Sequence, residues 1–423
     1  MSLNGYWHSR WPGEDGGPMR RQEPADGGEL GLRSRGRSLS VTHRPASNAG
    51  VGTMMVLRAP GEAYLLCHTG GNQAVSWVEQ IDPISLRTIR RSPSLEGGPT
   101  WPGGIACHAN GSLYVVFGQY AHRLSPELDV LATTKLPRQR PYNSFVILPD
   151  GCLVAKDFGG MKAGQDEPDG YEGTEVVVLE PDDLQIVGRR LVPEPSIARI
   201  SADGDDVYVV GDSSMWRLRW NGRELHLDSG YRALYRTLPG QTYGWDPVLE
   251  NGAAWFHDNG KGTERFTGSL RGLGVSRVPS SLVHIHLMTG EVALTEICGL
   301  EGGVVANPPV IDPVRRVAVA YDSGNGVVTG FRIDQRGVTG RLWSREINHA
   351  AHPLRYPSGE LVLCDYDLDR RMEQVLVLDI ETGEELARVD TGSPIQSVLF
   401  PCPGFGRDFY LVSFSTVTRC EVV

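Results

Sequence analysis

Short runs of hydrophobic residues recur along the chain from about residue 50 to the C-terminus, and Gly, Asp or Asn flanks most of them. The runs are rich in Val, Leu, Tyr and Phe, and the 3.6-residue periodicity of amphipathic helices is nearly absent. Each run therefore predicts a β-strand that follows a turn. The clearest examples are EAYLLCH (62–68), GSLYVVFG (111–118), GCLVAKD (151–157), DDVYVVGD (205–212), GAAWFHD (252–258), RRVAVAYD (315–322), GELVLCD (359–365) and RDFYLVSF (407–414).

Two further strands follow most of these runs, as in SWVEQIDPISLRTIRRS and QVLVLDIETGEELARVD. Asp-Pro, Pro-Asp-Asp or Thr-Gly sequences join the members of each pair, which is ordinary turn chemistry. The whole unit repeats about every 40–50 residues and has roughly four strands. This pattern predicts an all-β fold, a β-propeller of about eight four-stranded blades. A count of seven stays open if one unit is degenerate.

The last unit, residues 393–423, supplies only three of the expected strands. The β-prone segment SLSVTHRP (38–45) is expected to complete that blade and so to close the ring. Closure removes free sheet edges, which otherwise pair with other chains. We therefore expect a single propeller domain over residues 29–423. Residues 1–28 are polar, rich in Gly and Pro and without pattern, and they predict a flexible or extended N-terminal arm.

Composition excludes several classes of function. The chain has 41 Lys and Arg against 51 Asp and Glu residues, a formal charge of −10, and no basic run suited to nucleic acid. No stretch approaches the roughly 20 apolar residues of a membrane span, and the N-terminus shows no secretory signal. The seven cysteines show no metal-binding spacing and are expected to be reduced. We expect a cytoplasmic protein without a nucleic-acid or membrane partner; the oligomeric state is not predicted.

Two stretches resemble known repeat families. VLDIETGEELARV (377–389) resembles the YncE-like and quinoprotein-like propeller repeats, and RPYNSFVILPDGCLVAKDF (140–158) resembles the gluconolactonase/SMP-30 repeat. The second resemblance implies that Asn143, eight residues before Gly151, is a metal ligand. Later units carry Ser196, Gly244 and Ala351 at the equivalent position, so the family's metal set is at most partly present.

A propeller brings the loops before each first strand and the loops after each second strand to one face of the ring. The ends of the second strands carry a ring of polar residues. Its proposed members for a divalent ion (Ca, Mg, Mn, Zn or Fe), together with Asn143, are His68, Asp157, Asp212 and Asp322. Carboxylate and amide oxygens suit a hard cation. The alternative is structural, because Asp often starts a turn and accepts backbone N–H groups there.

Catalytic candidates and ligand contacts converge on the same mouth of the channel. His257 and His352 are candidate bases or metal ligands, Asp365 is a candidate base, and Lys156 is a candidate desolvated amine. Aromatic and basic side chains are expected to enclose a small organic ligand, and the basic groups would suit an acidic one. These substrate-binding candidates are Trp101, Tyr142, Tyr243, Trp245, Arg199 and Arg355.

The sequence supports three hypotheses about function. The first is an enzyme that uses metal-assisted hydrolysis, as in lactonases, or lyase or isomerase chemistry, on a small molecule at the channel mouth. The second is a propeller that binds a ligand or acts as a scaffold without catalysis. The third is a quinoprotein-type dehydrogenase. Fold alone does not decide between them.

Overall fold

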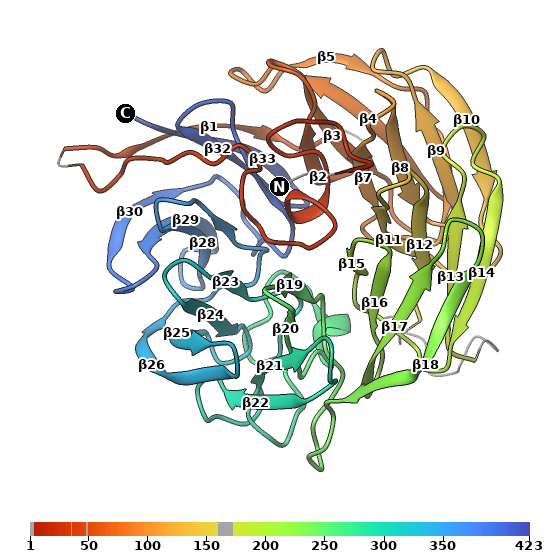
Figure 1. Cartoon of the computed structure of the whole chain (residues 1–423). Coiled ribbons are helices and arrows are strands. Elements are labelled where there is room, and N and C mark those ends of the chain that lie inside the picture. The colour runs from red at the N-terminus through yellow and green to blue at the C-terminus, as the bar shows by residue number, and fades with distance from the viewer. Residues whose placement is uncertain (1–3, 35, 48–49, 160–171) are drawn as a thin grey trace.

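The computed structural model describes residues 4–34, 36–47, 50–159 and 172–423. Eight four-stranded antiparallel sheets stand around a central axis like the blades of a propeller (Figure 1). The all-β prediction is confirmed, and the number of blades is eight. The described residues contain no α-helix, only the 3₁₀ turns η1 (Glu14–Gly16) and η2 (Thr263–Arg265). None of them forms a helix that could cross a bilayer.

The strands of the first four blades follow one another along the chain. Blade one contains β2 (Val51–Leu57), β3 (Ala63–His68), β4 (Ala74–Ile81) and β5 (Thr88–Arg91), with β6 (Leu95–Gly98) also paired to β4; blade two contains β7 (Gly104–Cys107), β8 (Leu113–Phe117), β9 (Tyr120–Leu124) and β10 (Val130–Lys135); blade three contains β11 (Tyr142–Ile147), β12 (Leu153–Asp157), β13 (Thr174–Leu179) and β14 (Ile186–Val192); blade four contains β15 (Ser201–Asp203), β16 (Asp206–Val210), β17 (Ser214–Trp220) and β18 (Leu225–Leu234).

The other four blades have the same order, except that the last takes one strand from the N-terminus. Blade five contains β19 (Val248–Glu250), β20 (Ala253–His257), β21 (Ser281–His286) and β22 (Val292–Glu296); blade six contains β23 (Val310–Asp312), β24 (Val317–Asp322), β25 (Val327–Asp334) and β26 (Gly337–Glu346); blade seven contains β27 (Leu354–Arg355), β28 (Glu360–Asp367), β29 (Met372–Asp379) and β30 (Glu385–Asp390); blade eight contains β31 (Pro401–Pro403), β32 (Asp408–Val412), β33 (Thr416–Val422) and β1 (Leu39–Pro45).

Burial explains why the second strand of each blade gave the clearest sequence signal. β8, β12 and β20 are buried along their whole length, because neighbouring blades cover both faces of these sheets. Near-continuous hydrophobic runs are the expected result. The fourth strands lie on the outer surface, and β10 is exposed or half-buried throughout, so its sequence is more polar. Blade-to-blade packing of these inner strands forms the core.

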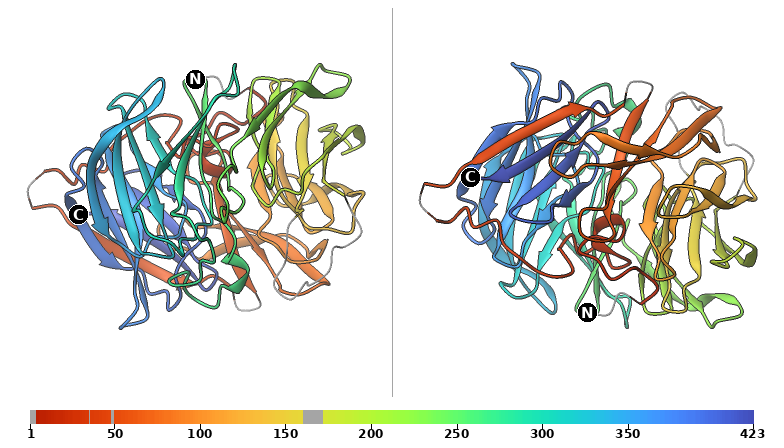
Figure 2. Two further views of the ribbon diagram at one scale, coloured as in Figure 1. Left: turned by 90° about the horizontal axis from the view of Figure 1, so that it is seen from below. Right: turned by 90° about the horizontal axis from the view of Figure 1, so that it is seen from above.

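The predicted ring closure is confirmed. β1 pairs antiparallel with β33 from Leu39 opposite Val422 to Pro45 opposite Thr416, and the two strands lie side by side in Figure 2. Arg44 then extends from β1 toward blade one, where its Nε donates to the Leu86 carbonyl at 2.6 Å. The N-terminal strand therefore links the last blade to the first.

The N-terminal segment before β1 differs from the flexible or extended arm that we expected. Residues 4–32, here called the central plug, pass through the middle of the ring (Figure 1). The plug bonds to the innermost strands of different blades: its Trp11 and Met19 carbonyls accept from Leu57 and Leu249, and its Gln22 carbonyl accepts from Arg355. Gly and Pro allow this irregular path, and the inner strands supply the hydrogen bonds that no local partner could.

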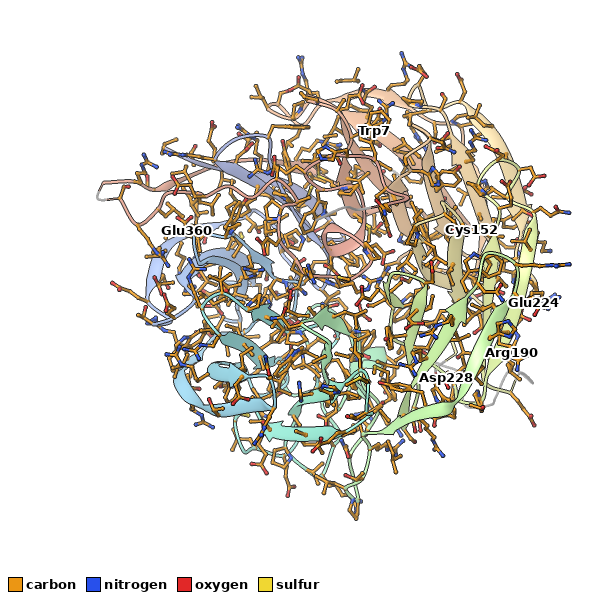
Figure 3. All side chains as sticks on the ribbon, viewed as in Figure 1. Trp7, Cys152, Arg190, Glu224, Asp228 and Glu360 are labelled. Carbon is orange, nitrogen blue, oxygen red and sulfur yellow. The ribbon has the colours of Figure 1, made fainter. Side chains whose placement is uncertain are left out.

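The end of the plug is held by one carboxylate. Glu360 accepts hydrogen bonds from the backbone N–H groups of Leu30 and Leu32, at 2.8 and 2.6 Å. Figure 3 labels Glu360 and shows how densely side chains fill the interior of the ring. The plug therefore leaves the centre of the ring at a fixed point before the chain reaches β1.

Candidate functional site

The central plug places two acidic side chains in the interior of the ring. Glu14 and Asp15 form the turn η1 and are 5% and 1% exposed. Arg20 binds both of them, with Nη2 2.6 Å from Glu14 Oε2 and Nη1 3.1 Å from Asp15 Oδ2. Its remaining donors reach the Ser144 hydroxyl and the Ile200 carbonyl. The plug thus carries a fully buried and fully satisfied ion-pair cluster.

A second arginine extends this cluster toward the mouth of the channel. Arg199 lies just before β15, and its Nη1 donates to Glu14 Oε1 at 2.9 Å. Its Nη2 donates to the Pro102 carbonyl, and its backbone N–H donates to Asp246 Oδ1 at 2.7 Å. The Arg199 guanidinium therefore joins blade four to blade two, and the Asp246 carboxylate joins blade five to blade four.

Asp15 also binds His352, from the loop before β27. The imidazole Nδ1 lies 3.0 and 3.1 Å from the two Asp15 carboxylate oxygens. Burial works to raise the pKa of Asp15, but His352 and Arg20 outweigh it and hold that pKa below its ordinary value. The other face of the histidine stacks on Phe400, with ring centroids 3.9 Å apart. No hydrogen bond joins Nε2 to any described residue. Asp15 thus fixes the ring and leaves one nitrogen available.

These polar groups lie beside an apolar cavity of about 240 Å³ at the channel mouth. Aromatic rings form much of its wall. Its lining comprises Trp101, Pro102, Arg199, Trp245, Asp246, Thr263, Glu264, Phe266, Leu270, Ala306, Asn307, His352, Val398, Leu399, Phe400 and Phe414. An apolar pocket with a few convergent polar groups is the usual form of a small-molecule site.

Four of the residues predicted from the sequence meet in this cavity: Trp101, Trp245, Arg199 and His352. Trp101 stacks on Phe158 at 4.3 Å between ring centroids, which sets its orientation. The loops that enter the first strands bring these four side chains together, as the propeller topology implied.

The four candidate aspartates that end second strands hold their own blades together. Asp157 pairs with Arg138 at 2.9 Å and accepts the backbone N–H of Glu175. Asp322 accepts the backbone N–H groups of Val304 and Asn325.

Asp365 accepts the backbone N–H of Asn348 at 2.8 Å and pairs with Arg388 at 2.7 Å. Asp212 pairs with Arg236 at 2.6 Å. Asp157, Asp322 and Asp365 therefore meet the structural alternative considered above, whereas Asp212 is held by an arginine. Among the described residues, no group of three or more His, Cys, Asp or Glu side chains is arranged to hold a metal ion.

The other predicted histidines lie deeper in the ring and do not line the mouth cavity. His257 Nδ1 bonds to the Asn307 carbonyl at 2.9 Å, and burial lowers the pKa of this histidine to about 4. His68 Nδ1 bonds to the Thr69 carbonyl, and burial lowers its pKa too. Both environments favour neutral imidazoles bound to backbone.

Lys156 is fully buried and also lies outside the mouth cavity. Its Nζ donates to the carbonyls of Asp157 and Ser196, at 3.1 and 3.0 Å. Burial lowers the pKa of Lys156 to about 7, against the opposing charges of Asp157 and Asp246. The amine is desolvated, as expected, and both of its hydrogen bonds go to backbone carbonyls.

The remaining candidates are spread over three places. Tyr142 is buried in the core of blades two and three. Tyr243 and Asp212 line an adjoining cavity of about 230 Å³ on the same face as the mouth. Arg355 is at the plug, where it pairs with Glu23 and lies 3.5 Å from Asp312. The side chain of Asn143 lies outside the described part of the chain.

Sequence analysis missed the residues that organise the site: Glu14, Asp15, Arg20 and Phe400. The segment WPGEDGGPMRR carried a signal, an acidic pair between glycines followed by two arginines. Opposite charges in a Gly-rich stretch are common in mobile tails, so the pattern by itself did not indicate burial. The loop 259–280, whose sequence fits no strand pattern, also supplies Phe266 and Leu270 to the cavity wall.

Comparison with known proteins shows the fold. No protein-family model and no curated protein matches the sequence. Among solved structures, the quinohemoprotein alcohol dehydrogenase from Comamonas testosteroni is 10% identical, with a TM-score of 0.64 over 97% of this chain and 80% of that one. A europium-containing methanol dehydrogenase is 11% identical, with a TM-score of 0.58 over 95% of this chain and 89% of that one.

A third similar structure is BamB from Moraxella catarrhalis, which is 11% identical, with a TM-score of 0.52 over 83% of this chain and 94% of that one. At such identity these likenesses establish the propeller and nothing about activity. The resemblance to YncE-like and gluconolactonase-like repeats stays a prediction.

Proposed function

We propose that this propeller is an enzyme that acts on a small organic molecule at the channel mouth, with His352 as its general base and acid. The observation that carries the proposal is the Asp15–His352 pair beside the apolar cavity. A carboxylate on one nitrogen orients an imidazole and stabilises its protonated form, while the other nitrogen exchanges protons with a reactant. His352 and Asp15 were 337 residues apart in sequence, so only the ring brings them together.

Each neighbouring residue has a distinct part in this scheme. Asp15 is a positioning residue, because it reaches the reactant only through His352. Arg199 lines the cavity and contributes positive charge near the place where negative charge would develop on a carbonyl oxygen. Hydrolysis of an ester or lactone through a water activated by His352, and proton transfer beside a carbonyl, both fit this arrangement.

The wall of the cavity favours an aromatic or largely apolar substrate. Trp101, Trp245, Phe266 and Phe414 present ring surfaces to the cavity. Against one arginine, the lining contains two carboxylates, Asp246 and Glu264, and that arginine already binds Glu14. The charges therefore support a neutral substrate better than the acidic one considered from sequence.

A divalent ion does not fit the residues at the mouth. Asp246 is held by the Arg199 backbone, and Glu264 accepts the backbone N–H of Gly262 at 2.8 Å. We therefore assign no step to a metal. The described residues also contain no cluster of three or more metal-binding side chains. Only the likeness of fold therefore supports the dehydrogenase hypothesis.

A ligand-binding propeller without catalysis is the competing proposal. It is favoured by the internal pairing of Glu14, Asp15, Arg20 and Arg199, which resembles a structural network. In that case His352 would contribute only to packing and to ligand contact.

Turnover of phenyl acetate and of dihydrocoumarin, an aromatic lactone, separates the two proposals. We expect hydrolysis by the wild type, a loss of about 10²–10⁴ in kcat/KM for His352→Gln, and a smaller loss for Asp15→Asn. His226→Gln is the matched control, because that side chain is 53% exposed at the surface. Unchanged turnover in His352→Gln would refute the assigned role. Binding of both compounds without turnover would favour the non-catalytic propeller.

A further inference from the structure

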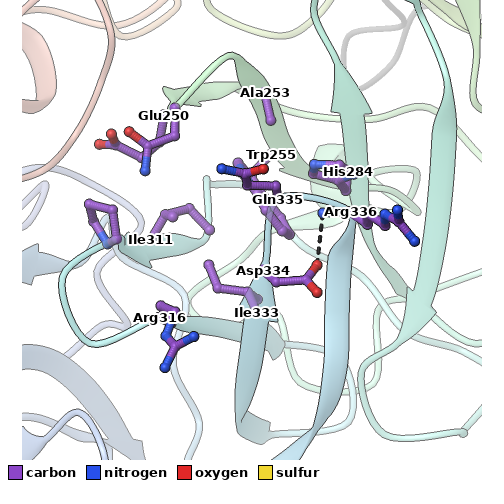
Figure 4. A pocket seen from close by; sticks show the side chains of 12 residues that line it. Glu250, Ala253, Trp255, His284, Ile311, Arg316, Ile333, Asp334, Gln335 and Arg336 are labelled. Atoms are coloured by element: carbon purple, nitrogen blue, oxygen red, sulfur yellow. Dashed lines mark hydrogen bonds between the residues drawn. The ribbon is translucent and has the colours of Figure 1, made fainter.

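A groove of about 450 Å³ lies between blades five and six, away from the channel mouth (Figure 4). Turns contribute Glu250 and Asn251 from blade five, and Arg316 and Asp334–Arg336 from blade six. This volume is within the range of about 300–1,000 Å³ typical of ligand pockets. No residue of this groove lines the mouth cavity, so the two are independent.

Two aromatic rings form the inner wall of the groove. Trp255 on β20 is directly opposite His284 on β21, and their ring centroids are 4.3 Å apart. The side chains of Ile311 and Ile333 lie beside them, as Figure 4 shows. A flat apolar molecule would find ring faces and branched aliphatic groups along the same wall.

The polar atoms of these rings have no hydrogen-bond partner in the part of the chain that the structure describes. Neither the Trp255 indole N–H nor either nitrogen of His284 bonds to any described residue, and His284 Nε2 is completely buried. The two residues are 3% and 5% exposed. Leaving a buried polar group unsatisfied is unfavourable, and native proteins contain few of them. The Trp255 indole N–H and His284 Nδ1 are not completely buried, so a molecule in the groove can offer them a hydrogen bond.

The charges at the rim are unequally paired. Glu250 pairs with Arg21 at 3.0 Å, and Asp334 accepts the backbone N–H of Arg336 at 2.7 Å. By contrast, the guanidinium groups of Arg316 and Arg336 form no ion pair or hydrogen bond with the described residues. Both side chains are exposed, so the rim offers two uncommitted cations to a ligand.

We propose that this groove binds a planar aromatic monoanion, with its rings against Trp255 and His284 and its carboxylate or similar group at Arg316 or Arg336. Arginine binds carboxylates through a planar, bidentate geometry. A single negative charge suits the rim, because the carboxylates already there would repel a larger one. The occupant and the site differ from those of the proposed reaction at the mouth.

Titration with 2-naphthoate, followed by fluorescence anisotropy and calorimetry, tests the proposal on the full chain. We expect saturable binding of one molecule per chain, and at least tenfold weaker binding of the uncharged 2-naphthamide. The double variant Arg316→Gln/Arg336→Gln should weaken 2-naphthoate binding at least tenfold. Both arginines are exposed and unpaired, so folding is not expected to change.

Two controls locate the binding. Arg332→Gln removes another exposed arginine of blade six that lies outside the groove and should leave affinity within twofold. Trp101→Leu alters the mouth cavity and should also leave the affinity for 2-naphthoate within twofold. The proposal is overturned if 2-naphthoate does not bind at millimolar concentration, if the amide binds equally well, or if Trp101→Leu abolishes binding while the double arginine variant does not.

Discussion

Replacing Arg20 with Met should destabilise the central plug more than any surface substitution of the same kind. The Arg20 side chain is 1% exposed and donates to Glu14, Asp15, Ser144 and the Ile200 carbonyl. Met has a similar length but no donor, so two buried carboxylates would each lose a charged partner, although Asp15 would keep His352 and Glu14 would keep Arg199. Breaking a buried ion pair in this way costs about 3–5 kcal/mol.

The expected change in melting temperature follows from the size of the chain. An unfolding entropy of about 2.1 cal/mol/K per residue gives roughly 0.9 kcal/mol/K for 423 residues, so 3–5 kcal/mol corresponds to a decrease of about 3–6 °C. If the plug opens without global unfolding, the same free energy instead speeds amide exchange in residues 4–32 by roughly 10² to 10⁴.

Arg33→Met is the matched control. Arg33 also pairs with a carboxylate, Asp379 at 2.6 Å, but its side chain is 40% exposed. An exposed pair contributes about 0–1 kcal/mol. Calorimetry and hydrogen exchange by mass spectrometry on both variants test whether the buried ion-pair cluster holds the plug in place. If Arg20→Met melts within 1 °C of Arg33→Met and its plug amides exchange as slowly, the buried cluster does not hold the plug.

Three further outcomes are expected. His257 has a folded pKa of about 4 against an ordinary 6.5, so the unfolded chain binds more protons between these pH values and the free energy of unfolding falls as pH drops from 6.5 toward 4. His257→Gln should flatten the pH dependence of the melting temperature between pH 4 and 6.5. An unchanged profile would contradict the neutral buried imidazole. Asp322→Ala should cost about 1–3 kcal/mol equally with calcium or with a chelator, since its oxygens bind backbone N–H groups; a calcium-dependent loss would instead reveal a metal site. Ser38 and Val423 exchange backbone hydrogen bonds, and paired residues alternate along an antiparallel ladder, so the Thr42 N–H faces β33 and the Val41 N–H faces outward. Because proline removes the N–H, Thr42→Pro should lower the melting temperature more than Val41→Pro. The reverse order would refute the assigned register.

The fold was predictable because a propeller blade repeats a local pattern. Each second strand, such as β24, is covered on both faces, so burial produces a hydrophobic run that repeats about every 40–50 residues. The shortest inner strands, such as β27 with two residues, were much harder to delimit. β18 gives a weak sequence signal, because its register shifts at a bulge and its side chains are mostly exposed or half-buried.

The site was predictable only in part. His352, Arg199, Trp101 and Trp245 were found because propeller topology sends every loop before a first strand to one mouth. Propeller topology also places the ends of the second strands at this face, which made Asp157, Asp322 and Asp365 candidates. The sequence could not show that their carboxylates already bind backbone N–H groups and arginines of their own blades. The direction of a side chain depends on partners that a repeat pattern does not specify.

The sequence by itself determined the architecture, including the strand that closes the ring, because hydrophobic alternation and turn residues act over a few neighbouring positions. The tertiary structure alone decided the role of the N-terminal segment. Residues 4–32 lack hydrophobic periodicity and resemble a mobile tail, yet inner strands of several blades satisfy their backbone groups, and Arg20, Arg199 and His352 bind their carboxylates. Asp15 meets His352 only because the plug runs through the centre of the ring, where the loop before β27 of blade seven reaches it.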